Sequence, residues 1–193
     1  MSKKMSNTKK MLIEVARELF AKNGKKDVTM NDIAEASKKG RRTLYTYFNN
    51  KEEIYKAVIN KELEQVLDSL YLVSIENVAP DIKLTNHIIT HLDAIKLVVT
   101  RNGSLRGDFF HDIYEVERTR RKVDVREIAL IKDILIEGIE SKVFKRMDPS
   151  LSAMIIFYAI KGLEVPYIRQ NISEEFDRNK NTIVEFVFQG IKK

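Results

Sequence analysis

Apolar residues recur at helical spacing through the first fifty residues, in three runs separated by polar breaks. The first run occupies 9–23 and stops at Gly24. Its apolar stripe is formed by Leu12, Ile13, Ala16, Leu19 and Phe20. Because residues three and four apart share one face of a helix, this stripe predicts an amphipathic helix that ends before the glycine.

Two shorter helices are predicted at 30–36 and 41–48. Thr29 stands just before the first of them, so its hydroxyl is expected to cap that helix while the Asp32 carboxylate reaches back. The polar segment 37–40 then breaks the pattern. Two short helices joined by a tight turn, with a third helix beside them, are typical of a helix-turn-helix.

A long helix is predicted next, at 51–70. Asn50 and Glu53 form a start that resembles a capping box, and apolar residues follow at helical spacing as far as Leu70. The region 71–80 has weak periodicity and ends in Ala-Pro-Asp. It is therefore predicted to be a loop or the frayed end of this helix.

The remainder of the chain is divided by four breaks, at Asn102-Gly103, Val123, Asp148-Pro149 and 171–173. Five more helices are predicted between them, at 81–101, 105–121, 124–142, 149–170 and 174–190. The chain is thus predicted to be all-α, with about nine helices. The last two carry apolar residues on more than one face, which predicts a homodimer through these two helices. Two ordinary core helices are the alternative.

The composition is typical of a helical protein that folds without disulfide bonds. Glycine (7) and proline (3) are scarce, and the chain has no cysteine, which excludes disulfides, thiolate metal sites and cysteine nucleophiles. The N-terminus lacks the apolar core of a signal peptide, and no apolar run approaches the roughly 18 residues that span a membrane. A cytoplasmic location without a membrane partner is expected.

The positive charge of the chain is concentrated at its N-terminus. Residues 1–62 hold 15 basic and 8 acidic residues, whereas 63–193 hold 19 and 20. A basic module of about sixty residues joined to a near-neutral body is typical of a nucleic-acid-binding domain attached to a different kind of domain. A merely solvated basic surface is the alternative.

The predicted helix at 41–48 has the chemistry of a DNA recognition helix. Leu44 and Phe48 are expected to pack inward. The outward set is then Arg41, Arg42, Thr43, Tyr45, Thr46 and Tyr47. Arginine can bind guanine O6 and N7, threonine can contact the thymine methyl group, and tyrosine hydroxyls can reach phosphate oxygens. A basic, solvated helix in a bundle is the alternative.

The segment from Thr8 to Ile59 contains ARELFAKNG, VTMNDIAEAS, RTLYTYF and NKEEIYKAV in order. It resembles the DNA-binding domain of the TetR family. The resemblance implies an all-helical dimeric regulator, with a DNA-binding domain at 1–50, a connecting helix at 51–70 and a ligand-binding and dimerisation domain over 51–193. It also implies a repressor that a small-molecule inducer releases from double-stranded operator DNA.

The same resemblance transfers phosphate contacts to Thr29 and Lys51, and a recognition-helix tyrosine to Tyr45 and to Tyr47. The turn departs from the family pattern. Where the family usually has a small residue, an apolar residue and Ser or Thr, this chain has Lys38, Lys39 and Gly40, followed by two arginines. Lys38 and Lys39 are therefore added to the candidate DNA contacts.

Candidate residues for an inducer pocket lie in the second half of the chain. His87 and His91 are four apart and share a helix face, which suits either a pocket or a pair of metal ligands, but no third ligand is specified. The other pocket candidates are Phe109, Phe110, Tyr114 and Tyr158. Core packing is the alternative for all of them, and no metal is assigned.

No enzyme is predicted, because the sequence contains no spaced nucleophile, base and orienting group, no glycine-rich phosphate loop and no metal set. No cofactor is expected beyond an unknown small-molecule inducer. A helical protein whose body binds another protein, with the N-terminal module kept for localisation on DNA, is the second functional hypothesis.

Overall fold

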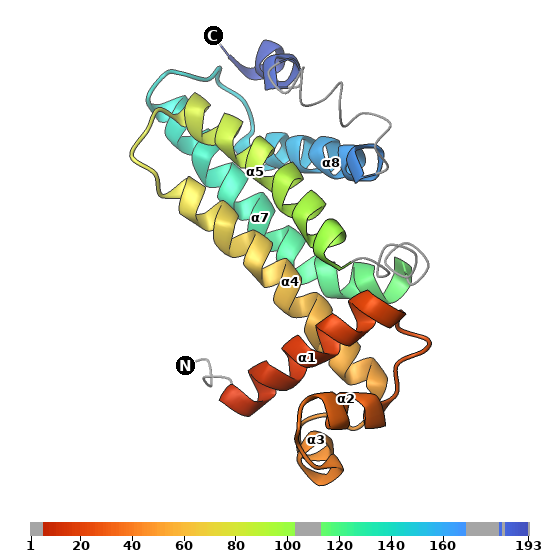
Figure 1. The fold of residues 1–193 in the computed structure, drawn as a ribbon. Helices are drawn as coiled ribbons and strands as arrows, with labels where there is room; N and C mark the ends of the chain where they lie inside the picture. Colours follow the sequence, from red (N-terminus) through yellow and green to blue (C-terminus); the bar gives the residue numbers. More distant parts are fainter. Residues whose placement is uncertain (1–5, 103–112, 169–181, 183, 193) are drawn as a thin grey trace. The chain divides into compact units, whose positions relative to one another are not determined.

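A computed structural model describes residues 6–102, 113–168, 182 and 184–192. Within these ranges the chain is helical, with no strand and a single isolated antiparallel bridge between Phe144 and Lys192. The labelled helices are α1 (Asn7–Asn23), α2 (Met30–Ala36), α3 (Arg41–Tyr47), α4 (Lys51–Ser74), α5 (Pro80–Arg101), α7 (Ile113–Glu140) and α8 (Pro149–Ile168) (Figure 1). Residues 184–191 are also helical. The predicted all-α class is confirmed.

The predicted break at Val123 is wrong. Helix α7 runs without interruption through this position, so the helices expected at 105–121 and 124–142 are, from 113 onward, one helix. Val123 is buried, and the next residue, Asp124, forms an ion pair with Lys161 at 2.7 Å. The helix therefore has an inward apolar group and a paired polar group at the point where the pattern looked interrupted.

Helix α4 is longer than predicted. It continues to Ser74 instead of ending at residue 70, because Leu70 and Val73 are both buried and extend its inward face by one turn. Helix α5 then begins at Pro80, where the absent backbone N–H costs nothing because the first N–H groups of a helix have no intrahelical partner.

The chain divides into two compact units. The first consists of 1–63 and 98–120, and the second of 64–97 and 121–193. The helices α4, α5 and α7 each contribute residues to both units. The domain boundary predicted between residues 50 and 51 is a functional division and stays a prediction.

The core of the first unit is built by one face of each of its helices. Helix α2 packs against both α1 and α3. Phe20 of α1 and Tyr55 of α4 meet edge to face, with their ring centroids 5.5 Å apart. The other buried apolar residues are Leu12, Ile13, Ala16, Val28, Ile33, Ala34, Leu44, Phe48, Ile54, Val58, Ile59, Leu63 and Val99.

The core of the second unit joins α5, α7, α8 and the helical segment 184–191. Its buried members are Leu84, Ile88, Leu92, Ile131, Ile134, Leu135, Phe144, Ala153, Ile156, Phe157, Ile160, Val184 and Ile191. Phe144 packs so tightly on α7 that a Cβ at Gly138 would lie 2.0 Å from its ring. The backbone N–H of Lys145 donates to the Ile191 carbonyl at 2.9 Å, which fixes the C-terminal segment to the loop after α7.

Candidate nucleic-acid interface

The start of α2 is capped as the sequence predicts. The backbone N–H of Asp32 donates to the Thr29 hydroxyl at 3.3 Å, and the backbone N–H of Thr29 donates to the Asp32 carboxylate at 2.7 Å. The backbone N–H and the hydroxyl of Thr29 both donate to the Asp32 carboxylate and hold the pKa of Asp32 below its ordinary value. The reciprocal bonds satisfy two backbone donors that the helix itself leaves without partners, and Thr29 remains exposed.

Helix α3 contributes little to the core of its unit. Leu44 is completely buried, and Phe48, which follows the helix as its C-cap, is nearly so. Arg41, Arg42, Tyr45 and Thr46 are exposed, whereas Thr43 and Tyr47 are half-buried. The predicted inward pair is confirmed, and the other six side chains form a polar outer face.

One hydroxyl on this outer face is already engaged. The Thr46 hydroxyl donates to the Arg42 carbonyl at 2.9 Å. Its proton is therefore not available to a partner outside the helix, and Thr46 can offer only its methyl group and an accepting oxygen. Tyr45, the residue before Thr46, is 49% exposed.

The basic turn between α2 and α3 has an unusual backbone. Lys38 adopts φ 53°, the left-handed region that a residue with a Cβ rarely occupies. Gly40 is the N-cap of α3 and provides no side-chain hydrogen bond to it. The departures from the family pattern therefore fall where a glycine and a capping hydroxyl would stabilise the turn.

The start of α4 is held by a second set of reciprocal bonds. The backbone N–H of Glu53 donates to Asn50 Oδ1 at 2.9 Å, and the Glu53 carboxylate accepts from the backbone N–H of Asn49 at 2.8 Å. The hydrogen bonds from the Asn49 side chain and backbone hold the pKa of Glu53 below its ordinary value. The capping predicted at Asn50 is present, with the returning bond made one residue earlier.

Lys51, a candidate phosphate contact, also has partners within its own unit. Its ammonium donates to the carbonyls of Lys25 at 2.8 Å and Lys26 at 3.1 Å. Lys25 in turn pairs with Glu52 at 2.8 Å and lies over the Tyr55 ring. An ammonium group has three N–H donors, so Lys51 can fix the loop after α1 and still donate one bond to a phosphate.

The histidines of the predicted inducer pocket are both buried in the second unit. The two rings meet one carboxylate oxygen, Oε1 of Glu127, with His91 Nδ1 at 2.7 Å and His87 Nε2 at 3.3 Å. The other nitrogen of His91, Nε2, lies 3.0 Å from Glu164 Oε1. His87 Nδ1 has no hydrogen-bond partner among the described residues. The cluster joins α5, α7 and α8.

The cluster is charged at neutral pH. Burial alone would favour neutral His91, but the charge of Glu127 and hydrogen bonds to Glu127 and Glu164 raise the pKa of His91 from 6.5 to about 9. Burial would likewise raise the pKa of Glu127, but His91 and the hydrogen bonds from both histidines lower it from 4.5 to about 2. Protonated His91 therefore donates from both nitrogens to the two carboxylates.

Of the other pocket candidates, only Tyr158 has a side chain that the structure describes. Tyr158 is 58% exposed on α8. Phe109, Phe110 and the side chain of Tyr114 lie outside the described residues. Among the side chains that are described, no three His, Cys, Asp or Glu residues are grouped so as to hold a metal ion.

Comparison with known proteins gives the family. Residues 12–58 match the model of the bacterial regulatory proteins of the tetR family. The match supports a TetR-family transcriptional regulator. The family match ends within α4, and it includes α2, α3 and the whole basic turn between them.

Several relatives match most of the length of the chain. An uncharacterized HTH-type transcriptional regulator of Bacillus subtilis, YhgD, is 28% identical over 95% of this chain and 96% of its own. A transcriptional regulator from Cytophaga hutchinsonii has a TM-score of 0.79 at 21% identity, covering 95% of this chain and 98% of its own. FadR from Bacillus subtilis, solved in complex with stearoyl-CoA, has a TM-score of 0.69 at 22% identity, covering 92% and 96%.

No helix in the described parts of the chain is long and apolar enough to cross a membrane.

Among the described residues, three buried carboxylates were not predicted from the sequence: Glu62, Glu127 and Glu164. Each is at most 4% exposed and occupies a position on the inward, apolar stripe of its helix. A glutamate at such a position requires a buried cationic or hydrogen-bonding partner. A glutamate on an apolar stripe can be recognised in the sequence. Its partners cannot, because they are 36 or more residues away in the chain.

Replacing Lys38 with glycine should stabilise the first unit by about 0.5 kcal/mol. The left-handed backbone costs a residue with a Cβ roughly 1–2 kcal/mol, of which the greater freedom of glycine in the unfolded chain cancels roughly 0.5–1 kcal/mol. Chemical denaturation measures the difference. Lys39→Gly is the matched control and should lower the free energy of unfolding. Equal destabilisation by both substitutions would contradict the assigned strain.

The free energy of unfolding should fall as the pH rises from about 6.5 to about 9. Over this interval folded His91 keeps a proton that the unfolded chain has released, so added base favours unfolding. Urea denaturation at both ends of the interval measures the loss. His91→Gln should flatten the dependence, and an unchanged slope in that variant would show that His91 does not cause it.

Proposed function

We propose that the chain is a homodimeric repressor that binds operator DNA through α3 and is released by a small molecule bound in its second unit. The outer face of α3 carries this proposal. Leu44 and Phe48 bury almost completely, so the helix is fixed while its remaining polar side chains stay available. A major groove is wide enough to admit one such helix.

The exposed residues divide into two groups by their chemistry. Arg41 and Arg42 extend from the N-terminal end of α3, where a guanidinium can donate two parallel bonds to guanine O6 and N7. Thr29, Lys51 and the turn lysines flank that helix in sequence and suit phosphate oxygens, which fix the orientation of the protein on DNA. Tyr45 provides a hydroxyl for either role.

An exposed apolar stripe supports dimerisation through the last two helices. Leu151, Met154, Ile155 and Tyr158 of α8 recur at helical spacing and are 45% to 61% exposed. Phe186 of the C-terminal segment is 78% exposed. A contiguous apolar surface of this kind is typical of a protein interface. A second copy of the chain is the partner we propose, because two-fold dimers place two recognition helices on successive turns of DNA.

Ligand release follows from linkage between two binding events. If the ligand and the operator favour different conformations of the dimer, each must weaken the binding of the other by the same factor. The complex of FadR with stearoyl-CoA makes a long-chain acyl-CoA the first ligand to test. A fatty-acyl chain would also suit the apolar core of the second unit. The cluster at His87 and His91 would be the polar part of such a binding site.

The double substitution Arg42→Ala, Tyr45→Ala should weaken specific DNA binding without unfolding the protein. Both side chains are exposed. The expected loss is tenfold or more, because each good base contact is worth roughly 1–3 kcal/mol. Fluorescence anisotropy with a DNA fragment that the wild-type protein selects from a random library measures it. Arg121→Ala, which removes an exposed charge from the second unit, should bind as wild type. Undiminished binding by the double variant would sink the proposal.

Ile155→Glu should convert the dimer to a monomer. A carboxylate on the α8 stripe would have to lose its water at the interface, at a cost that the apolar contacts do not offset. Sedimentation velocity at micromolar concentration distinguishes the two states. Ile82→Glu, a change at an exposed isoleucine of α5, is the control and should leave the dimer intact. A wild-type monomer, or a dimer that tolerates Ile155→Glu, would refute this interface.

A further inference from the structure

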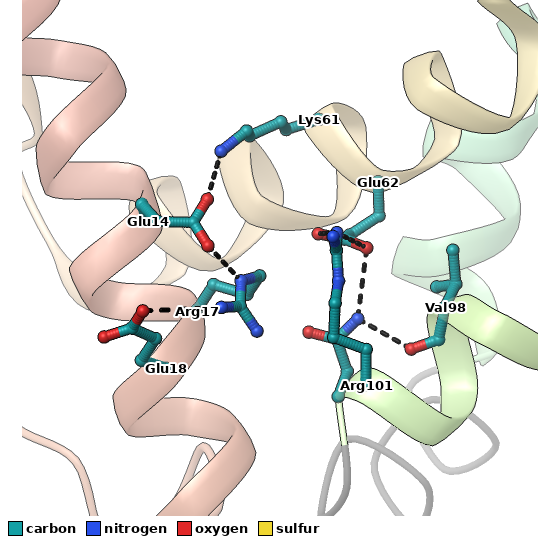
Figure 2. A network of polar contacts seen from close by, with 8 residues as sticks. Glu14, Arg17, Glu18, Lys61, Glu62, Val98 and Arg101 are labelled. Atoms are coloured by element: carbon teal, nitrogen blue, oxygen red, sulfur yellow. Dashed lines mark hydrogen bonds and ion pairs between the residues drawn. The ribbon is translucent and has the colours of Figure 1, made fainter.

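Two successive residues of α4 bind two different helices of the first unit (Figure 2). Lys61 forms an ion pair with Glu14 of α1. Glu62 accepts hydrogen bonds from Arg101, at the end of α5. Because adjacent residues of a helix point in different directions, one turn of α4 can hold both neighbours at once.

The Glu62 end of this arrangement is a buried clamp. The carboxylate is 2% exposed and accepts from Arg101 Nη2 at 2.5 and 2.6 Å and from Asn102 Nδ2 at 3.1 Å. Asn102 is equally buried and also donates to the Val98 carbonyl at 2.7 Å. A carboxylate so far from water is stable only with its partners in place. The last turn of α5 is therefore held to α4 through charge.

The clamp leaves one polar atom unsatisfied. Asn102 Oδ1 has no hydrogen-bond partner among the described residues, although the side chain is 1% exposed. A buried acceptor without a partner disfavours the arrangement that contains it. Among the described residues, the clamp therefore engages both amide hydrogens of Asn102 but not its amide oxygen.

The Lys61 end reaches the helix that supports the DNA-binding helices. Glu14 accepts from Arg17 Nε at 2.6 Å as well as from Lys61, and Arg17 is largely buried. Helix α1 packs on α2, and α2 packs on α3. Contacts therefore continue from the α4 segment at residues 61–62 to the recognition helix within one compact unit.

Helix α5 begins in the second unit, and its final turn from Val98 onward belongs to the first. We propose that Glu62 is a positioning residue for operator binding, because it ties this final turn to the part of α4 that Lys61 ties to α1. The position of α5 and the DNA affinity of the first unit then depend on each other. The inference rests on the proposed function and assigns one residue through which the two units communicate.

Hydrogen exchange tests this dependence without a ligand. Because linkage is reciprocal, DNA bound at α3 must alter the end of α5 if the end of α5 alters DNA binding. The probe is the DNA fragment selected from a random library by the wild-type protein. In the wild type, DNA should slow amide exchange over 98–102 by about fivefold, the lower end of typical coupling between sites.

Glu62→Gln should remove that response. The variant keeps the shape of the side chain and can still accept from Asn102, but it cannot pair with the Arg101 charge. It should bind the fragment several-fold more weakly with an unchanged salt dependence, since no phosphate contact is lost, and DNA should no longer slow exchange over 98–102. Glu62→Gln, Arg101→Gln replaces the whole ion pair by neutral groups and should behave in the same way. If the Glu62→Gln protein unfolds, this double variant tests the inference in its place.

Glu64→Gln is the matched control. Glu64 lies two residues further along α4 and pairs with Arg126 at 2.7 Å on the exposed surface. This variant should respond to DNA as the wild type does. The inference is overturned if wild-type protein binds DNA with unchanged exchange over 98–102, or if the folded Glu62 variants retain the response. Failure to select any DNA overturns the proposed function itself, and the two failures are thus distinguishable.

Discussion

The molecule depends on the burial of two side chains, Leu44 and Phe48, at a seven-residue helix. A helix of this length does not persist alone in water, because the cost of nucleation exceeds the few hydrogen bonds that it can form. α3 is held in place by these two apolar groups against the first unit's core, and its other six residues need not face inward. Because α3 is so short, it is attached through only two buried side chains, and its outer face is left available to a partner.

Other contacts in the first unit stabilise the packing of α3 against the core. Reciprocal capping fixes the starts of α2 and α4, so the chain enters and leaves the helix-turn-helix in defined directions. Lys51 fixes the loop after α1 by two carbonyl bonds. Against these stabilising contacts, the turn at Lys38 carries backbone strain, and Gly40 lacks a capping side chain. The basic turn therefore combines backbone strain with a helix start that no side chain caps.

Buried charge is the second organising feature. Glu62 in the first unit and Glu127 and Glu164 in the second each replace an apolar residue on an inward stripe. Buried ion pairs contribute little net stability, but breaking one leaves an uncompensated charge and is strongly unfavourable. Such pairs therefore restrict how helices can move relative to one another within a unit. This suits a regulator in which a few defined arrangements must be distinguished.

Local chemistry made the N-terminal part predictable. The positions of α2 and α3, the Thr29 cap and the inward direction of Leu44 and Phe48 all depend on residues within four positions of one another. Helix α7 was predicted as two helices because the stabilisation at Val123 and Asp124 comes from burial and from Lys161, 37 residues away. The partners of His87 and His91 were missed for the same reason.

The DNA contacts of individual side chains were inferred from chemistry and family resemblance, and they depend on the bound geometry of a dimer. The departures at Lys38 to Arg42 matter most here, because they alter both the charge and the backbone of the turn that precedes the proposed recognition helix. The burial pattern of α3 limits the candidates to six residues, and Thr46 is further limited by its bond to the Arg42 carbonyl.

Genome-wide mapping of the DNA bound by the protein in its native cell tests the central claim most directly. A dimeric operator-binding regulator should occupy a small number of discrete sites that share a two-fold symmetric sequence, with half-sites about one helical turn apart. The same map with the Arg42→Ala, Tyr45→Ala protein should lose these sites. Uniform, sequence-independent occupancy, or identical maps for the two proteins, would contradict the account.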